Sequence, residues 1–470
     1  MKNILIRMSG RILRLYDTRT GKKKEVKPLR NDNIIRLYIC GPTVYDYSHI
    51  GHFKTFITYD SLVRLLKYIG YDVIHVVNIT DIDDKIINKA AEEGVSYRDI
   101  SEKYTDDFLE IWRRLNMMPP YAIPRATYHI QDMITIINKL IEDGYAYTAD
   151  GNVYFSVSKF EKYGEISKQK TDELIQGYRV EEGEGKIDML DFALWKKSKE
   201  GEPSWESPWG PGRPGWHIEC TAMSNRFLDP PFEIHGGGED LKFPHHENER
   251  AQTNSYIGGE AVYIWMHVGI LKFAKEKMSK SLGNIIIMRD MLKKFSPDLI
   301  RLIILSTHYR KQLEYSDDKI EEAKNILRRI KRVYRKLMDY EEYGVGGSID
   351  IDSYRDRFLN ELLNDFNTAS ALSSFMSFIY RLESTIDNKK LSKSEKLNAL
   401  SFIEEFKYIY GLTLKDELKH DDKLIGLLIN VRSELRRRRI YEVADMIRNM
   451  LGEMGIVLED LGDKTIYYRI

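Results

Sequence analysis

Two stretches near the start decide the fold: IIRLYIC at residues 34–40 and HIGH at residues 49–52. The first is apolar enough for a buried strand. The second lies where a helical pattern begins, which continues through residues 53–69. A turn from strand to helix aims backbone N–H groups and the positive end of the helix dipole at a bound anion. Because Gly51 has no Cβ, a nucleotide can approach the backbone there. These stretches therefore predict a nucleotide site at a strand–helix turn.

A second apolar run, Val73 to Ile79, follows the helix and suits a strand buried in a parallel sheet. The resulting β–α–β unit is typical of a doubly wound sheet, whose ligands bind at the carboxyl ends of the strands. The polar run from Asn78 to Asp84 falls at such an end. We therefore expect its side chains to face the ligand crevice.

A second signature, KMSKS, occupies residues 277–281 and places two ammonium groups on one short stretch. Lys277 and Lys280 are suited to neutralising charge that develops at the α-phosphate of ATP. Each signature alone has a plainer reading, as another type of nucleotidyltransferase or as a solvated loop. Together, and in this order, they resemble the class I aminoacyl-tRNA synthetases. That resemblance implies activation of an amino acid with ATP and its transfer to tRNA.

Composition limits the remaining choices. The chain has 470 residues, 42% of them hydrophobic, which predicts two to four domains. Its mean hydropathy is −0.44, and no apolar run reaches the roughly 18 residues of a membrane helix. Two cysteines and no signal-like segment favour a reducing cytoplasm over secretion. The net charge of +0 means that any RNA binding must use local basic patches.

The fold class that we predict is α/β. It comprises a doubly wound, Rossmann-type catalytic domain split by an insertion, followed by an all-helical C-terminal region. A hairpin is expected at residues 144–157, and helical spacing of apolar residues begins at Asp317 and continues with a long helix from Lys423 to Leu451. The predicted segments are 1–125 (first half of the catalytic domain), 126–213 (insertion), 214–268 (second half), 269–318 (linking segment), 319–415 (helical bundle) and 416–470 (C-terminal anticodon-binding region).

Four side chains offer ligand types that zinc accepts: Cys40, Cys220, His245 and Glu249. His245 and Glu249 are four residues apart, so they share one face of a helix that we expect to open near Pro244. The chain has no Cys-x-x-Cys pair, and a free cysteine is commonly a small buried hydrophobe. From spacing alone, a metal site and a pair of buried core cysteines are equally good interpretations.

The chain resembles the cysteinyl-tRNA synthetase family in order and over nearly its whole length. The motifs that carry the resemblance are CGPTVYD (40–46), NITDIDDK (78–85), GRPGWHIEC (212–220), HGGGED (235–240), FPHHENE (243–249), DFNT (365–368) and GIVLED (455–460). It implies one zinc ion held by the residues matching Cys40, Cys220, His245 and Glu249, with the substrate thiol bound directly to the metal. Zinc binds a thiolate far better than a serine hydroxyl, whereas hydrogen bonds discriminate poorly between near-isosteres. Four protein ligands normally make a closed structural site, so this role requires a fifth position or a weak carboxylate ligand.

The same resemblance implies the remaining roles. Thr80, Trp216 and His235 would line the cysteine pocket. Without the family they would be read as a strand-end cap, a core tryptophan and a turn histidine. The residues implied for ATP are His49, His52, Gly236, Gly237, Gly238 and Lys280, and those implied for catalysis are His49, His52, Lys277 and Lys280. Mg²⁺ would arrive with the ATP.

The C-terminal region would recognise tRNA(Cys) in a monomeric enzyme. Arg432 and Arg436 to Arg439 suit phosphate contacts, while Tyr467 and Tyr468 suit stacking on unpaired bases. Three other functions fit parts of the pattern. They are a ligase that joins cysteine to a small-molecule amine, a nucleotidyltransferase with a structural zinc, and a zinc-stabilised RNA-binding protein without activity. The helical tail disfavours the first, and the intact signatures disfavour the last.

Overall fold

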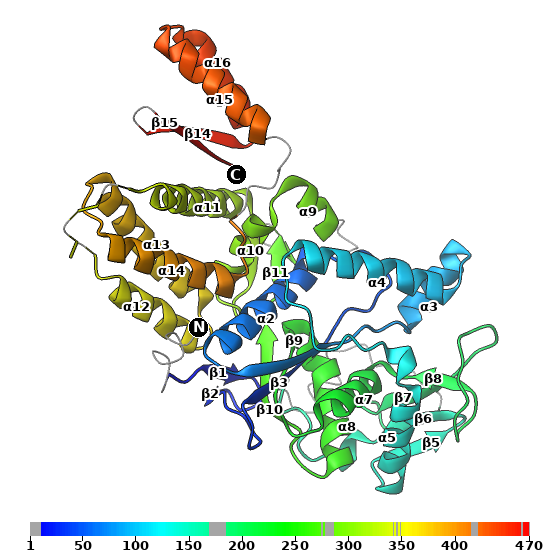
Figure 1. Cartoon of the computed structure of the whole chain (residues 1–470). Coiled ribbons are helices and arrows are strands. Elements are labelled where there is room, and N and C mark those ends of the chain that lie inside the picture. The colour runs from blue at the N-terminus through cyan, green and yellow to red at the C-terminus, as the bar shows by residue number, and fades with distance from the viewer. Residues whose placement is uncertain are drawn as a thin grey trace. The chain divides into compact units, whose positions relative to one another are not determined.

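The computed structural model describes residues 11–168, 185–273, 276–277, 286–341, 343–344, 346–347, 349–414, 422–461 and 464–469 (Figure 1). The chain forms two compact units. The first comprises Met1–Arg289, His308–Leu313 and Glu361–Asn367, and the second comprises Asp290–Thr307, Glu314–Asn360 and Thr368–Ile470. Within the described ranges, no helix combines the length and the apolar character needed to cross a membrane.

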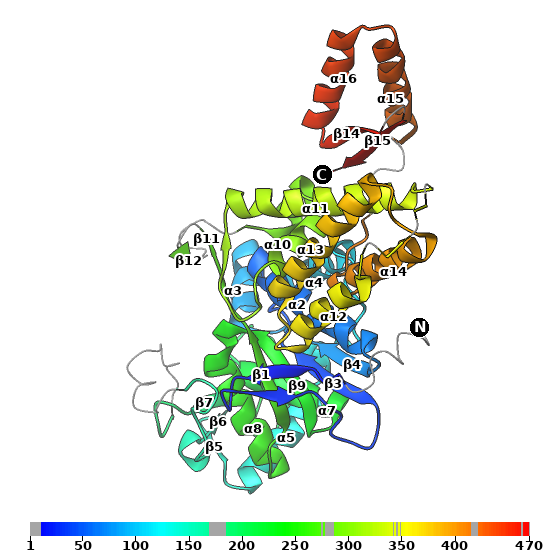
Figure 2. The ribbon, with the colours of Figure 1, turned by 90° about the vertical axis from the view of Figure 1, so that its left-hand side faces the viewer.

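The first unit is built on a four-stranded parallel sheet in the order β10–β9–β3–β4. The strands are β3 (Ile34–Ile39), β4 (Asp72–Val77), β9 (Phe232–Gly238) and β10 (Val262–Val268). Helix α2 (Ile50–Tyr68) joins β3 to β4, and α8 (Glu247–Ile257) joins β9 to β10. β3 and β9 are neighbours whose connections leave in opposite directions, so right-handed crossovers place α2 and α8 on opposite faces. Figures 1 and 2 show this arrangement, with α7 (Trp216–Leu228) on the face of α8.

This topology predicts where a ligand binds. In an open parallel sheet, the crevice lies at the carboxyl ends of the two strands where the order reverses. Here those strands are β3 and β9, so Cys40, just after β3, and Gly238, the last residue of β9, lie at the predicted crevice. Both strands are almost entirely buried, which agrees with the continuous apolar sequence of β3.

A long segment separates β4 from α7 and β9. It contains α3 (Asp84–Glu93), α4 (Tyr97–Arg114), η1 (Ala126–Tyr128), α5 (Ile130–Glu142) and an antiparallel sheet of β5 (Ala146–Ala149), β6 (Asn152–Phe155), β7 (Phe192–Lys197) and β8 (Gly212–Pro214), with η2 (Val157–Lys159) after β6. The hairpin expected at residues 144–157 is confirmed as β5 and β6. Its turn residues Asp150 and Gly151 have φ of 50° and 84°, as a type I′ turn requires.

The helix that carries Glu249 starts later than we expected. The chain forms η3 (Glu239–Leu241) and a helical turn at Lys242–His246 before α8 begins at Glu247. Phe243 interrupts the helical backbone with φ of −140° and ψ of 135°. Pro244 therefore lies in the turn that precedes α8, and His245 follows it there.

Smaller elements complete the first unit. Strands β1 (Arg14–Asp17) and β2 (Lys22–Glu25) pair antiparallel, as do β11 (Leu271–Phe273) and β12 (Glu276–Lys277). Asp365, at the edge of the DFNT motif, accepts hydrogen bonds from the backbone N–H of Tyr16 (2.9 Å) and the hydroxyl of Tyr309 (2.7 Å). This carboxylate thus joins three segments that are distant in sequence. Helix α9 (Met288–Lys294) begins within the unit, and β13 (Leu313–Tyr315) begins at the end of its segment His308–Leu313.

From Asp317 to residue 453, the elements that the structure describes in the second unit are all helices, as predicted. This unit contains α10 (Pro297–Leu305), α11 (Asp317–Met338), α12 (Ile351–Leu363), α13 (Thr368–Asp387) and α14 (Lys393–Tyr410). Helix α11 starts at the predicted Asp317 and buries every apolar position of the predicted stripe from Ile320 to Leu337. This agreement reflects a regular amphipathic pattern over 22 residues.

Two expectations for the C-terminal region were wrong. The single helix expected from Lys423 to Leu451 is two helices, α15 (Asp422–Arg437) and α16 (Tyr441–Glu453), separated where Arg439 adopts a φ of 64°. The region is also not wholly helical, because β14 (Ile456–Leu461) and β15 (Lys464–Arg469) form a hairpin. Ile456 and Leu458 are buried in alternation with half-buried neighbours, which is the period of a strand.

Candidate active site

A cavity of about 320 Å³ lies in the first unit, at the predicted crevice. Cys40, Trp216 and Gly238 line it together with the two histidines of the HIGH stretch, His49 and His52. The structure therefore brings to one cavity residues that the sequence analysis assigned to the metal, the amino acid and ATP.

Cys40, Cys220, His245 and Glu249 form a buried cluster at the base of this cavity. One ligand atom from each lies within 4.8 Å of those of the other three. The Sγ atoms of the two cysteines are 3.8 Å apart, and His245 Nε2 lies 2.9 Å from Glu249 Oε1. The four come from the end of β3, from α7, from the turn before α8 and from α8 itself. None is more than 5% exposed.

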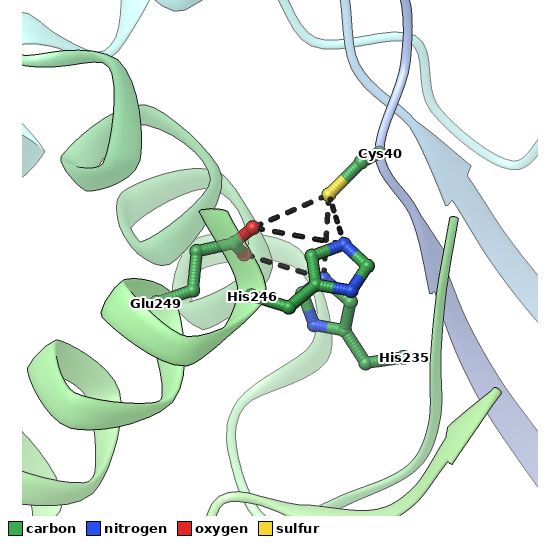
Figure 3. A group of neighbouring side chains, drawn as sticks. All are labelled: Cys40, His235, His246 and Glu249. Carbon is green, nitrogen blue, oxygen red and sulfur yellow. Dashed lines mark hydrogen bonds and ion pairs between the residues drawn. The ribbon is translucent and has the colours of Figure 1, made fainter. Parts of the chain in front are cut away.

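A second set overlaps the first and shares Cys40 and Glu249 with it (Figure 3). His235 Nε2 lies 3.4 Å from Cys40 Sγ and 3.2 Å from Glu249 Oε2. His246 Nε2 lies 3.2 Å from Cys40 Sγ. The four atoms of this set also fall within 4.8 Å of one another. Geometry alone therefore admits two sets of four ligands around one thiol and one carboxylate.

Three histidines that the sequence analysis did not assign hold these groups in place. His217 Nδ1 lies 2.9 Å from Nδ1 of His245, so the outer nitrogen of His245 is engaged while Nε2 faces Glu249. His246 Nδ1 lies 2.8 Å from His267 Nε2. Outer partners of this kind fix ring orientation and tautomer at metal sites. No spacing signal marks them, because they come from three separate elements.

The charges of the cluster shift the pKa values of its members. Burial, Cys220 and Glu249 all raise the pKa of the Cys40 thiol well above its ordinary value. Burial raises the pKa of Cys220 too, but bonds from Cys40 and His245 outweigh it and bring that pKa to about 6. Burial lowers the pKa of His245, yet the charge of Glu249 reverses this and raises it to about 10. A proton on His245 thus offsets part of the negative charge of Cys220 and Glu249, and one negative charge remains in the cluster.

This donor set fits a divalent zinc ion. Two sulfurs, one imidazole nitrogen and one carboxylate oxygen are all zinc ligands, and burial of a thiolate beside a carboxylate is costly without a cation. A bound cation would replace the proton on His245 and favour thiolates over thiols. Cys40 also faces the cavity, so a metal at the cluster would be reached from the cavity side.

Of the three residues predicted for the cysteine pocket, Trp216 lines the cavity, whereas Thr80 and His235 are buried and are not among its lining residues. Trp216 lines the cavity and stacks on His245 with ring centroids 4.1 Å apart. Thr80 is buried and donates its hydroxyl proton to Glu219 Oε2 at 2.8 Å. Glu219 itself is buried, which raises its pKa well above the ordinary value. The Thr80 oxygen also accepts a hydrogen bond from the side-chain amide of Asn78 at 3.4 Å, so one lone pair remains for a further donor such as an ammonium group.

The part of the cavity predicted to bind the nucleotide, called the nucleotide end below, lies at the start of α2. His49 is the N-cap of this helix, where its Nδ1 accepts a hydrogen bond from the backbone N–H of His52 at 3.3 Å. The two imidazole rings stack with centroids 3.6 Å apart. A Cβ on Gly51 would lie 2.9 Å from the His49 ring, so glycine is required here to seat the histidine.

The three glycines predicted for ATP occupy different surroundings. A Cβ on Gly236 would approach the Tyr59 hydroxyl to 2.3 Å, and one on Gly237 would approach the His246 ring to 2.8 Å. Gly238 lines the cavity. The first two glycines thus make room for protein side chains, and the third faces the predicted ligand.

The KMSKS signature is only partly described. The backbone of Lys277 pairs with that of Lys272 in the β11–β12 ladder. Lys280 lies outside the described residues. After the signature, the chain returns to the HIGH stretch, where the backbone N–H of Ile50 bonds to the carbonyl of Ile286 at 3.0 Å. Backbone pairing thus brings the segment after the second signature to the first.

The arginines predicted to contact RNA divide into two groups. Arg432 is 1% exposed and binds both oxygens of Asp460, at 2.7 and 2.8 Å, so the structure contradicts its role as a phosphate ligand. Arg436 also bonds to Asp460. Arg437 and Arg438 pair with Glu434, but their side chains remain 79% and 68% exposed. The exposed charge of this region therefore lies at the end of α15 and in the following turn.

The comparisons with known proteins agree with this geometry. Residues 25–325 match the family described as "tRNA synthetases class I (C) catalytic domain". A cysteine–tRNA ligase of Thermococcus gammatolerans is 44% identical, covering 97% of this chain and 99% of that protein. One from Thermotoga maritima is 43% identical with the same coverage.

Solved structures with low sequence identity share the fold. A Mycobacterium tuberculosis methionyl-tRNA synthetase in complex with methionyl-adenylate has a TM-score of 0.59 at 17% identity, covering 80% of this chain and 90% of that one. An Agrobacterium radiobacter leucyl-tRNA synthetase in a ternary complex has a TM-score of 0.60 at 10% identity, covering 82% of this chain and 84% of that one.

Proposed function

The chain belongs to the family of cysteine–tRNA ligases, and from this premise we propose that zinc bound by Cys40, Cys220, His245 and Glu249 selects its amino acid. The family's reaction joins cysteine to tRNA in two steps, through a cysteinyl-adenylate. The observation that carries the proposal is the buried cluster itself, which meets the cavity of the HIGH histidines at Cys40 and Trp216. When bound, zinc would supply a cationic site for the substrate thiolate that a serine hydroxyl does not match.

The side chains around the cluster then position the rest of the substrate. The Thr80 oxygen accepts a hydrogen bond from the substrate ammonium, because its own proton is committed to Glu219. Trp216, stacked on His245, forms the wall beside the side chain. His235, 2% exposed and beside Cys40, keeps the base of the pocket free of water.

At the other end, the protein binds and aligns ATP. His49 and His52 contact the triphosphate, and the backbone of Gly238 lies against the nucleotide. Lys277 and Lys280 stabilise the charge that builds up as the carboxylate attacks the α-phosphorus and pyrophosphate leaves, with Mg²⁺ bound to the phosphates. Alignment of nucleophile, phosphorus and leaving group supplies much of the rate without a covalent enzyme intermediate.

Neighbouring histidines allow a direct test of the metal assignment. His245→Gln removes a ligand of the proposed set, while His246→Gln removes one of the overlapping set and leaves the proposed set whole. We expect His245→Gln to abolish stoichiometric zinc and His246→Gln to retain it, as measured by metal analysis after dialysis. Loss of zinc only from the His246 variant would reject the proposed set. Retention by both would make the cluster a buried polar core instead of a metal site.

We also propose that the exposed arginines at the end of α15, Arg437 to Arg439, contact the phosphates of tRNA(Cys), and that the enzyme acts as a monomer. In this proposal, residues 416–470 form the anticodon-binding region and residues 126–213 the insertion in the catalytic domain. The support is the exposed positive charge and the full-length coverage of the cysteine–tRNA ligases. The rate at which tRNA is charged, measured with adenylate held at a fixed supply, tests the contacts of these arginines separately from amino-acid activation.

A further inference from the structure

A buried lysine lies two residues after the HIGH stretch. Lys54, at the start of the second turn of α2, is 1% exposed, and its ammonium points into the protein. It donates hydrogen bonds to three backbone carbonyls: those of Gly269, Ile270 (3.4 Å) and Lys311 (2.9 Å). Among the described residues, no carboxylate lies within ion-pair distance of it. An ammonium has three donors, and here each has a carbonyl acceptor.

The carbonyls belong to two backbone segments that pack closely. Gly269 donates its N–H to the carbonyl of Tyr309 (2.8 Å), and Leu313 donates its N–H to that of Ile270 (3.1 Å). A Cβ on Gly269 would lie 2.7 Å from the carbonyl oxygen of Lys311, so only glycine permits this approach. Lys54 reaches from α2 to the place where these two segments meet and bonds to carbonyls of both.

The same segment forms a wall of the cavity. Gly269, Ile270 and Leu271 line it together with His52 and Thr55 from the first two turns of α2. Leu271 also begins β11, which pairs with the strand that contains Lys277. The position of this wall relative to His52 therefore depends on the contact made by Lys54.

We propose that Lys54 is a positioning residue for amino-acid activation: its ammonium ties the helix of the HIGH stretch to the Gly269–Leu271 wall and so fixes the nucleotide end of the cavity. This role goes beyond the proposed function, although it rests on ATP binding in this cavity. It does not depend on which residues hold the metal. A displacement of the wall by about 1 Å is enough to lower an activation rate about 100-fold.

Burial provides a pH signature for this contact. It lowers the pKa of Lys54 to about 8, and the only opposing charge of note is Glu239 on η3. On the packed segments, Arg310 is paired with Asp365, while Lys272 and Lys311 add positive charge. Above pH 8 the amine loses one donor, and a lone pair then faces a carbonyl. The activation rate should therefore fall with an apparent pKa near 8.

Protein stability should respond in the opposite direction. Because the pKa of Lys54 is lower in the folded than in the unfolded chain, the unfolded chain binds more protons between about pH 8 and 10.5. This group therefore makes the free energy of unfolding rise with pH in that range. A residue that merely stabilised the fold would not combine a rising stability with a falling activation rate.

The test compares Lys54→Met, Lys54→Arg and the matched control Lys67→Met, which makes the same change at an exposed position in the last turn of α2. ATP–pyrophosphate exchange is measured from pH 6.5 to pH 9.5, with urea unfolding in parallel. We expect Lys54→Met to lower kcat roughly 10- to 100-fold with little change in the KM for cysteine. Its rate should also lack the fall above pH 8, here called the alkaline limb of the pH profile. Lys54→Arg should retain activity with the limb moved to higher pH, and Lys67→Met should match the unchanged enzyme.

Either of two results would overturn the proposal: a normal kcat in Lys54→Met, or an alkaline limb in Lys54→Arg identical to that of the unchanged enzyme. If Lys54→Met does not fold, the pH profile of Lys54→Arg still decides the question. Failure of the zinc proposal is distinguishable, because it would alter metal content and the response to serine without altering the pH limb.

Discussion

The two ends of the cavity are built in different ways. At the thiol end, side chains from β3, α7, the turn before α8 and α8 converge on a cluster whose ligand atoms lie within 4.8 Å of one another. At the nucleotide end, the lining combines the side chains of His49 and His52 with Gly238 and the Gly269–Leu271 wall. We therefore expect the thiol end to depend on the chemistry of its side chains, and the nucleotide end to depend also on the relative position of backbone segments.

Because of this difference, we expect one end of the cavity to determine which amino acid is used and the other to determine how fast it is activated. A buried donor set chooses between ligands by the chemistry of one atom, so changes there should alter which amino acid is used. Backbone segments around a triphosphate act by alignment, so changes there should alter how fast any bound amino acid reacts. Substitutions at the two ends should therefore have separable effects.

The largest expected effect is at the nucleotide end. Lys280→Ala removes a charge that we propose stabilises the departing pyrophosphate, and we expect the activation rate to fall up to about 1,000-fold. Cysteine binding to the loaded enzyme should be nearly unchanged, since the thiol end is intact. Equilibrium binding of cysteine and single-turnover activation measure the two quantities. Equal losses in both would show that the two ends are not separable.

The next effect is at the thiol end. Cys220→Ser replaces a thiolate with a hydroxyl that stays protonated at neutral pH, so we expect zinc affinity to fall more than about 100-fold. Competition with a chelator measures that affinity. Saturating zinc should partly restore cysteine activation. Unchanged zinc affinity would exclude Cys220 from the ligand set.

A smaller effect is expected at Thr80. Thr80→Val keeps the shape of the side chain but removes the acceptor for the substrate ammonium and leaves Glu219 without its donor. We expect the KM for cysteine to rise about 10-fold, the equivalent of one buried hydrogen bond. Thr80→Ser, which keeps the hydroxyl, should remain close to the unchanged enzyme. A similar rise in both variants would point to packing instead of the hydrogen bond.

The smallest effect lies outside the cavity. Reversal of two exposed charges, in Arg437→Glu with Arg438→Glu, should raise the KM for tRNA several-fold and reduce the salt dependence of binding by roughly one to two ions. Pyrophosphate exchange without tRNA should be unaffected. Arg357→Glu, on α12, serves as the control. An unchanged KM for tRNA would remove these arginines from the RNA-binding face.

Regular patterns made much of the fold predictable. The buried runs of β3 and β4 and the amphipathic stripe of α11 have clear periods, and each is found where it was expected. The hairpin around Gly151 was recognisable because its turn needs positive φ values. The C-terminal hairpin was not predicted because the apolar alternation of β14 is short and follows a long helical pattern. A run of this length is equally compatible with an irregular C-terminal segment.

The site was less predictable from the residues themselves. The four proposed ligands are dispersed from residue 40 to residue 249, so only the family resemblance grouped them. His217, His246 and His267 were not assigned roles, since what they do depends on three-dimensional proximity. Arg432 was misjudged because its sequence context does not reveal Asp460, which binds it from the hairpin.

The central claim, that a metal at the thiol end selects the substrate, is most directly tested by ATP–pyrophosphate exchange with cysteine and with serine, before and after zinc removal. The account predicts exchange that requires cysteine, ignores serine and is lost with zinc. Readdition of zinc should restore it. Exchange that persists without zinc, or that proceeds equally with serine, would contradict the account.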